Sequence, residues 1–218
     1  MLTKPFEERV RAVTQKIAGR LLGRSGISPN MMTAIGLLLT LTVTATLASG
    51  HLAWGGVLVL VTSAFDMLDG ALARATDRKS TFGAFFDSTV DRYTEALVLL
   101  GLLLYYDHLP TAGYEVVWIY LGIVGSLMVS YTRARAEALG FECKVGLLGR
   151  PERIILLALG LLVGWVSFAL ATLAIFTNFT AAQRVFHVWR EDRKRQPQVA
   201  VAKVPRRGWF APRDQTPS

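Results

Sequence analysis

Cysteine, histidine and charged residues are scarce in this 218-residue chain. A single cysteine, Cys143, excludes an internal disulfide framework, and one Cys with three His residues is too few for a zinc site built from four Cys and His ligands. Charged residues make up 18% of the chain and hydrophobic residues 52%, which excludes an ordinary soluble globular domain. The N-terminal segment also lacks the short apolar core and small-residue cleavage site of a signal peptide.

Long uncharged apolar runs dominate the sequence instead. A helix that crosses a membrane needs about 20 mostly apolar residues. The last run is too long for one such helix, so we divide it near Gly164 and Trp165. The pattern predicts an all-α integral membrane protein with six transmembrane helices, based on runs at residues 31–49, 52–65, 96–106, 116–131 and 154–183.

The formal net charge of +8 gathers on one side of the predicted membrane. Of the 24 Lys and Arg residues, 23 lie in segments 1–30, 74–81, 132–153 and 184–218, and Arg92 lies inside a helix. Because Lys and Arg accumulate in cytoplasmic segments, this distribution places both termini in the cytoplasm of a plasma-membrane protein. It also accounts for the basic charge without nucleic acid, which we do not expect as a partner.

The predicted membrane domain, residues 31–189, is flanked by two segments of different composition. Residues 1–30 mix charge with spaced apolar side chains, which predicts an amphipathic helix lying on the membrane surface. Residues 190–218 are basic, contain four prolines and show no helical period, which predicts a disordered cytoplasmic tail.

Four acidic residues lie where a membrane makes them costly. Asp66 and Asp69 are three residues apart at the end of one predicted helix, and Asp87 and Asp91 are four apart in the next. A charge inside the membrane costs ~2.5–3.5 kcal/mol, so four of them indicate a function. Each pair shares one helix face and the two pairs can converge. Because oxygen ligands suit Mg²⁺ or Mn²⁺, we predict a divalent metal site.

Small residues and an arginine follow the first aspartate pair. Gly70, Ala73 and Gly83 allow either a ligand or a neighbouring helix to approach closely. Arg74 suits a diphosphate clamp, although an arginine in a helix interface has the same appearance. Carboxylates, metal ions and an arginine together indicate phosphoryl-type chemistry.

The spacing of these residues resembles the signature of the CDP-alcohol phosphatidyltransferase family. That signature reads Asp-x-x-Asp-Gly-x-x-Ala-Arg, eight residues, Gly, three residues, Asp, three residues and Asp. The resemblance covers roughly residues 4–189. Every position of the signature is matched, by Asp66, Asp69, Gly70, Ala73, Arg74, Gly83, Asp87 and Asp91.

The resemblance implies that an acceptor hydroxyl displaces CMP from CDP-diacylglycerol or its ether-lipid equivalent, with two Mg²⁺ or Mn²⁺ ions. Asp66, Asp69 and Asp87 would hold one ion, and Asp66, Asp87 and Asp91 the other. Asp91 would also be the general base. Homodimers are common in this family and one is expected here. Contacts with the CDP-lipid are implied for Pro29, Asn30, Asp69, Gly70, Ala73, Arg74, Ser80 and Gly83.

The acceptor is predicted from arginines that follow the fourth predicted helix. The motifs at 133–137 and 150–153 resemble the branch that makes phosphatidylinositol phosphate, or its archaeal ether-lipid equivalent, from inositol phosphate. One departure is Arg133, where that branch often has Lys. The accumulation of Lys and Arg in cytoplasmic segments equally explains these arginines. The density of the arginines also suits a phosphate on the acceptor, with Arg133, Arg135, Arg150 and Arg153 as its ligands.

One further residue and two alternatives remain open at this point. Glu95, one turn beyond Asp91, is predicted to orient Asp91 or an acceptor hydroxyl. A phosphatidylglycerophosphate synthase, using glycerol 3-phosphate, more often has Asp-Pro after the glycine, a pair absent here. A small ion-coupled transporter would place its charges near the bilayer midplane and between inverted repeats, whereas these acids cluster at one interface.

Overall fold

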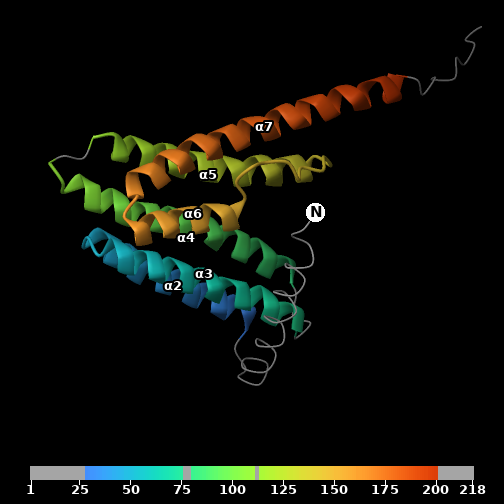
Figure 1. Cartoon of the computed structure of the whole chain (residues 1–218). Coiled ribbons are helices and arrows are strands. Elements are labelled where there is room, and N and C mark those ends of the chain that lie inside the picture. The colour runs from blue at the N-terminus through green and yellow to red at the C-terminus, as the bar shows by residue number, and fades with distance from the viewer. Residues whose placement is uncertain (1–27, 76–79, 111–112, 201–218) are drawn as a thin grey trace, which may run out of the picture.

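The structure, a computed structural model, describes residues 28–75, 80–110 and 113–200, without the side chains of 67–75 and 196–200. Most of these residues form helices (Figure 1). These residues contain no strand, which confirms the all-α prediction. The amphipathic helix predicted for residues 1–30 lies almost wholly outside them. The helices are α2 (Pro29–Ala48), α3 (Leu52–Ala75), α4 (Thr81–Asp107), α5 (Tyr114–Ala138), α6 (Arg150–Val163) and α7 (Val166–Ala200).

The helices pack into a closed ring. Around it the order is α2, α3, α6, α7, α5 and α4, and α4 returns to α2. Close approach within the ring depends on small residues: a Cβ at Gly101 of α4 would lie 2.7 Å from the Thr44 carbonyl oxygen of α2. Apolar side chains fill the interior, among them Leu47, Leu99, Leu102, Ile119, Leu161 and Leu170.

The chain crosses the ring in alternating directions. The connections from α2 to α3, α4 to α5 and α6 to α7 lie at one end of the bundle, as Figure 1 shows. The predicted break near Gly164 and Trp165 is confirmed, because α6 ends at Val163 and α7 begins at Val166. Gly164 has φ +82°, the left-handed conformation in which glycine commonly ends a helix.

Serine caps fix the start of two helices at the opposite end of the bundle. We call this end the basic end, because Arg133, Arg135 and Arg150 lie there. Ser28 accepts a hydrogen bond from the Met31 N–H at 3.2 Å, and Pro29 opens α2. Ser80 accepts one from the Gly83 N–H at 2.9 Å at the start of α4. The first turns of α2 and α4 therefore lie at the basic end, and we call the polar opening between the helices there the mouth of the bundle.

Within the residues that the structure describes, three stretches are long and apolar enough to cross a membrane: Pro29–Ala48, Tyr114–Ala138 and Val166–Arg195. The apolar part of α3 is shorter, Leu52–Asp66, and α6 has 14 residues. The helix α4 carries three charged side chains in its first half, Asp87, Asp91 and Arg92, and a fourth, Glu95, near its middle. Charged side chains therefore shorten the apolar part of α3 and α4, and α6 is short as a whole, so the prediction of six transmembrane helices stays a prediction.

Two helices are longer than predicted. The loop expected at 132–153 begins only after Ala138, so Arg133 and Arg135 lie on the last turns of α5. The helix α7 continues to Ala200, so the disorder predicted from residue 190 is wrong for 190–200. Both extensions are rich in strong helix formers, and Lys194 pairs with Glu191 at 2.5 Å, one turn apart.

Candidate active site

Asp66 packs against α2 at Gly36, a residue without a side chain. A Cβ at Gly36 of α2 would be 2.7 Å from Asp66 Oδ1, closer than real Cβ atoms approach. The glycine therefore makes room for the carboxylate to turn into the bundle. Sequence reasoning missed Gly36, because a glycine in an apolar membrane helix has the appearance of an ordinary packing residue.

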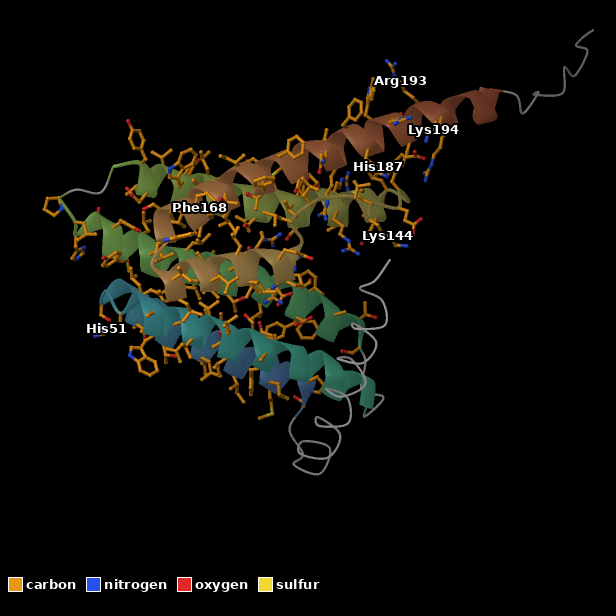
Figure 2. All side chains as sticks on the ribbon, viewed as in Figure 1. His51, Lys144, Phe168, His187, Arg193 and Lys194 are labelled. Carbon is orange, nitrogen blue, oxygen red and sulfur yellow. The ribbon has the colours of Figure 1, made fainter. Side chains whose placement is uncertain are left out.

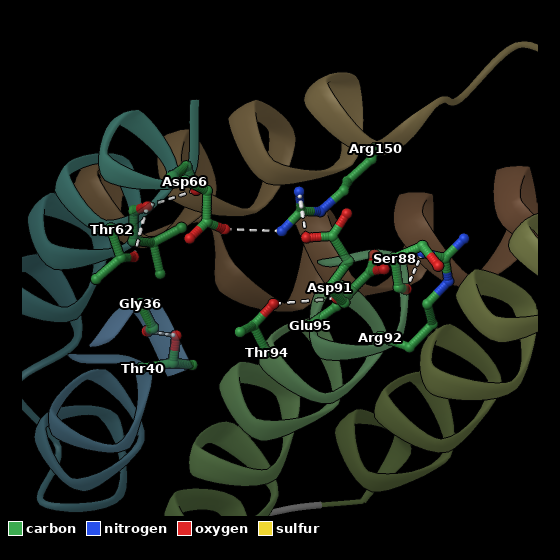
Figure 3. Close-up of polar contacts among 12 residues, drawn as sticks. Gly36, Thr40, Thr62, Asp66, Ser88, Asp91, Arg92, Thr94, Glu95 and Arg150 are labelled. Atoms are coloured by element: carbon green, nitrogen blue, oxygen red, sulfur yellow. Dashed lines mark hydrogen bonds and ion pairs between the residues drawn. The ribbon is translucent and has the colours of Figure 1, made fainter. Parts of the chain in front are cut away.

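Arg150 joins Asp66 and Asp91, which come from different helices. Its Nη2 lies 2.9 Å from Asp66 Oδ2 and its Nη1 lies 2.8 Å from Asp91 Oδ1 (Figure 3). The predicted convergence of α3 and α4 carboxylates is thus observed for these two residues. Arg150 is the first residue of α6, so this helix delivers a cation directly to the carboxylates. The two carboxylates are close enough to share one cation.

The remaining members of the predicted metal set lie on the same helices. Asp87 is half-buried on α4, one turn before Asp91. The backbone of α3 continues in helix through Asp69 to Ala75, but the side chains of Asp69, Gly70, Ala73 and Arg74 lie outside the described ones. Among the described side chains, no three His, Cys, Asp or Glu residues gather closely enough to hold a metal ion.

The donor set nevertheless fits a divalent metal. Asp66 and Asp91 offer oxygen ligands only, and Mg²⁺ and Mn²⁺ prefer such ligands. The guanidinium of Arg150 shows that a cation is held between them in this structure. A metal bound to these two aspartates would therefore replace one cation with another.

Glu95 and Arg153 form a second, deeper ion pair between α4 and α6. Arg153 donates from Nε to Glu95 Oε1 at 2.6 Å and from Nη2 to Oε2 at 2.9 Å, and it is 2% exposed. Glu95 follows Asp91 by four residues and Arg153 follows Arg150 by three, so this pair lies one turn below Arg150. The side chains predicted to contact acceptor and base thus bind each other.

A small cavity lies beside these pairs, with a volume of about 40 Å³. It has room for only a few water molecules, so a substrate the size of a CDP-lipid headgroup does not fit inside it. The Thr40 hydroxyl donates to the Gly36 carbonyl oxygen at 2.9 Å and the Thr94 hydroxyl to that of Asp91 at 3.0 Å. Its polar lining is Thr40, Thr62, Ser63, Asp66, Thr94, Glu95, Arg150 and Arg153.

Three of the residues predicted to contact the CDP-lipid come together at the mouth. A Cβ at Gly83 would lie 2.9 Å from Ser80 Oγ and 3.0 Å from Asn30 Oδ1. The first turns of α2 and α4 therefore meet here, with Pro29 next to Asn30. The backbone at Gly83 is accessible only because the residue has no side chain.

The other two predicted acceptor ligands lie on a different helix from Arg150. Arg133 and Arg135 are exposed on the end of α5, and Arg133 pairs with Glu137 at 2.8 Å. In the loop that follows, Lys144 hydrogen-bonds to Glu142, which lowers the pKa of that carboxyl. Sequence reasoning missed Arg184, which is buried and bound to backbone carbonyls. A lone arginine near the end of an apolar run was the available signal.

Known proteins resemble the chain along most of its length. A family model described as CDP-alcohol phosphatidyltransferase matches residues 26–188. The archaetidylinositol phosphate synthase of Methanothermobacter thermautotrophicus is 36% identical over 188 residues, covering 83% of this chain and 92% of that protein.

Two crystal structures of the Mycobacterium tuberculosis phosphatidylinositol phosphate synthase share the fold. The structure with CDP-DAG bound gives a TM-score of 0.76 at 32% identity, covering 82% of this chain and 94% of that one. The complex with manganese and citrate gives 0.74 at 33% identity, covering 81% and 88%.

Proposed function

The chain belongs to the CDP-alcohol phosphatidyltransferase family, and on that premise we propose that it transfers the phosphatidyl group of CDP-diacylglycerol, or its ether-lipid counterpart, to a hydroxyl of inositol phosphate. CMP would be released. The observation that carries the proposal is the contact of Arg150 with Asp66 and Asp91, because a guanidinium, which suits a phosphate, lies beside the predicted base. The names of the relatives, an archaetidylinositol phosphate synthase and a phosphatidylinositol phosphate synthase, support the choice of acceptor.

The chain is a multi-pass membrane protein. In finer detail we propose six transmembrane helices in a catalytic domain at 31–189, preceded by an amphipathic segment at 1–30 and followed by a basic segment at 190–218. Both termini and the active site would face the cytoplasm across the plasma membrane. The concentration of Lys and Arg at the basic end supports this orientation. A soluble acceptor and the CDP-lipid headgroup would then reach the site from one side.

Asp66, Asp69, Asp87 and Asp91 would hold two divalent ions, Mg²⁺ or Mn²⁺. The manganese complex of the structural relative supports a metal of this kind. When bound, such ions neutralise negative charge on the diphosphate and on the leaving CMP. The carboxylate of Asp91 would accept the proton of the acceptor hydroxyl, for which it must lie within ~2.6–3.2 Å of that oxygen.

The binding residues would divide between two sides of the mouth. On the acceptor side, Arg133, Arg135 and Arg150 would hold the phosphate through charge-assisted hydrogen bonds. Arg153 and Glu95 would hold α6 against α4 through their ion pair, so that Arg150 faces the acceptor. The CDP-lipid side would consist of Pro29, Asn30, Asp69, Gly70, Ala73, Arg74, Ser80 and Gly83.

A homodimer is a further part of the proposal. Large aromatic side chains are exposed on two neighbouring helices, with Tyr93 on α4 and Tyr120 and Tyr131 on α5 at 59–65%. Exposed aromatics on adjacent helices provide area for a second copy, although lipid would also cover them. The mass of the protein in detergent tests this part alone.

Release of CMP by the purified protein tests the proposed reaction. CDP-diacylglycerol and Mn²⁺ would be supplied with inositol phosphate, glycerol 3-phosphate, inositol or serine in separate reactions. We expect release with inositol phosphate only. Release with glycerol 3-phosphate alone would replace the proposed acceptor and retain the transferase. No release with any acceptor, from folded protein also given an ether-linked donor, would contradict the transferase itself.

A further inference from the structure

The loop from Leu139 to Gly149 joins the arginines of the proposed acceptor site. Arg133 and Arg135 precede it on α5, and Arg150 follows it at the start of α6. The distance and orientation between these arginines therefore depend on how the loop is held. No regular helix or strand orders its backbone, so side chains from elsewhere must do so.

One face of α7 supplies those side chains. His187 Nε2 lies 3.1 Å from the Glu142 carbonyl oxygen, and Arg195 Nη2 donates to that of Gly140 at 2.6 Å. Their spacing along α7 brings them, with two earlier residues, to one side of the helix. We call this set the α7 stripe: Thr180, Arg184, His187 and Arg195.

Arg184 and Thr180 continue the same contacts deeper in the bundle. Arg184 Nε donates to the Val145 carbonyl oxygen at 2.9 Å, and its Nη1 donates to that of Val129 on α5. Thr180 Oγ1 accepts from the N–H groups of Leu147 and Leu148, both at 3.4 Å. The loop thus runs antiparallel to α7, and successive backbone groups meet successive turns of the helix.

The loop itself is shaped to lie against the stripe. Gly146 has φ +138°, and a Cβ there would lie 2.6 Å from Thr180 Cγ2. Glycine therefore provides both the backbone conformation and the close approach. The Arg195 guanidinium also lies 4.0 Å from the centre of the Phe141 ring. Cys143, in the middle of the loop, is fully buried.

We propose that the α7 stripe positions the 139–149 loop and thereby sets the geometry of the acceptor-phosphate site. This inference rests on the proposed function, because it concerns the acceptor arginines of that site. The stripe residues are positioning residues: they bind the loop backbone, whereas the arginines at its two ends bind the acceptor. The part of α7 beyond residue 189 then belongs to the site architecture, since Arg195 lies there.

The test pairs acceptor kinetics with a measurement that needs no activity. Cys143 is the only cysteine, so its rate of reaction with a maleimide in the folded, detergent-solubilised protein reports whether the loop is docked. His187→Leu and Arg195→Ala remove one side of the contact, and Gly146→Ala disturbs the other. We expect each to raise the labelling rate and the KM for inositol phosphate roughly 2- to 10-fold, the effect of one lost hydrogen bond. The KM for CDP-diacylglycerol would stay within twofold.

Two controls separate positioning from general loss of structure. Arg193 stacks on Trp189 at 4.2 Å, and Figure 2 shows it on the side of α7 away from His187, so Arg193→Ala should label and turn over as the unchanged protein does. His187→Gln keeps an N–H donor and should restore slow labelling and the lower KM.

Three results would overturn the inference: unchanged labelling in His187→Leu and Arg195→Ala, equal acceleration in Arg193→Ala, or a parallel rise of both KM values. If the unchanged protein releases no CMP with inositol phosphate, the proposed function fails, and the labelling rates alone still decide whether the stripe holds the loop.

Discussion

Two regions at the basic end of the bundle are held together by different kinds of contact. One region, which we call the aspartate pocket, consists of Asp66, Asp91 and Arg150, whose charged side chains pair with one another. In the 139–149 loop, side chains of α7 bind the backbone, as His187 does at Glu142. The pocket needs particular side chains at fixed positions, whereas most positions of the loop contribute only a backbone carbonyl group, which every residue has. Substitutions should therefore be far more costly in the pocket.

The largest effect is expected at the predicted base. Asp91→Asn should lower the rate of CMP release by about 10²- to 10⁴-fold, because an amide cannot accept the acceptor proton, while CDP-lipid binding is retained. Parallel turnover and equilibrium-binding measurements check this. Asp107→Asn, at the exposed far end of the same helix, is the matched control and should behave as the unchanged protein. More than a tenth of normal turnover in Asp91→Asn would remove Asp91 as the base.

The next effect concerns the buried ion pair beside the pocket. Arg153→Met leaves the Glu95 carboxylate buried without its partner, and breaking such a pair costs ~3–5 kcal/mol. Thermal unfolding in detergent should show this loss of stability. Adding Glu95→Gln should recover part of it, because the uncompensated charge is then gone. A double variant no more stable than the single one would contradict the account of this pair.

A smaller effect is expected where α2 meets α4. Gly83→Ala adds a Cβ within about 3 Å of Ser80 and Asn30, and overpacking costs ~1–3 kcal/mol. The KM for the CDP-lipid should rise by about 5-fold or more, while the KM for inositol phosphate stays the same. Gly113→Ala is the control, since a Cβ there meets nothing within 4 Å. A change confined to the acceptor KM would place Gly83 on the wrong side of the mouth.

The smallest effect belongs to the exposed counterpart of the buried pair. Arg133 and Glu137 are each about half exposed, at 52% and 51%, and pairs of this kind contribute ~0.5 kcal/mol or less. Glu137→Gln should therefore leave the thermal unfolding midpoint almost unchanged. A destabilisation as large as that of Arg153→Met would show that burial does not distinguish these two Arg and Glu pairs.

The aspartate pocket was predictable from the sequence because each of its residues is costly in an apolar helix. Asp66 and Asp91 stood out for this reason, and the break at Gly164 followed from the length of the last apolar run. The direct contact of Arg150 with both aspartates was not predictable, since it depends on how α6 packs against α3. Gly36 was hidden for the same reason, because only the packing of α3 on α2 gives it a role.

The loop region was less predictable because its contacts involve the backbone. Nothing in the residue types at Gly140 or Glu142 indicates that their carbonyl oxygens bind α7. The extension of α7 to Ala200 was not predicted, because the basic composition of residues 190–218 indicated disorder. The helix propensity of the first residues in this segment favours a helix instead. A long helix bearing a polar stripe supports an irregular loop, and hydropathy alone does not show this.

The most direct test of the central claim is to let two acceptors compete and to identify the lipid product by its molecular mass. The protein would receive CDP-diacylglycerol, Mn²⁺, and equal concentrations of inositol phosphate and glycerol 3-phosphate. The account predicts that phosphatidylinositol phosphate is the dominant product, and that Arg150→Ala lowers its yield. A product consisting of phosphatidylglycerophosphate would contradict the assignment of the arginines to inositol phosphate.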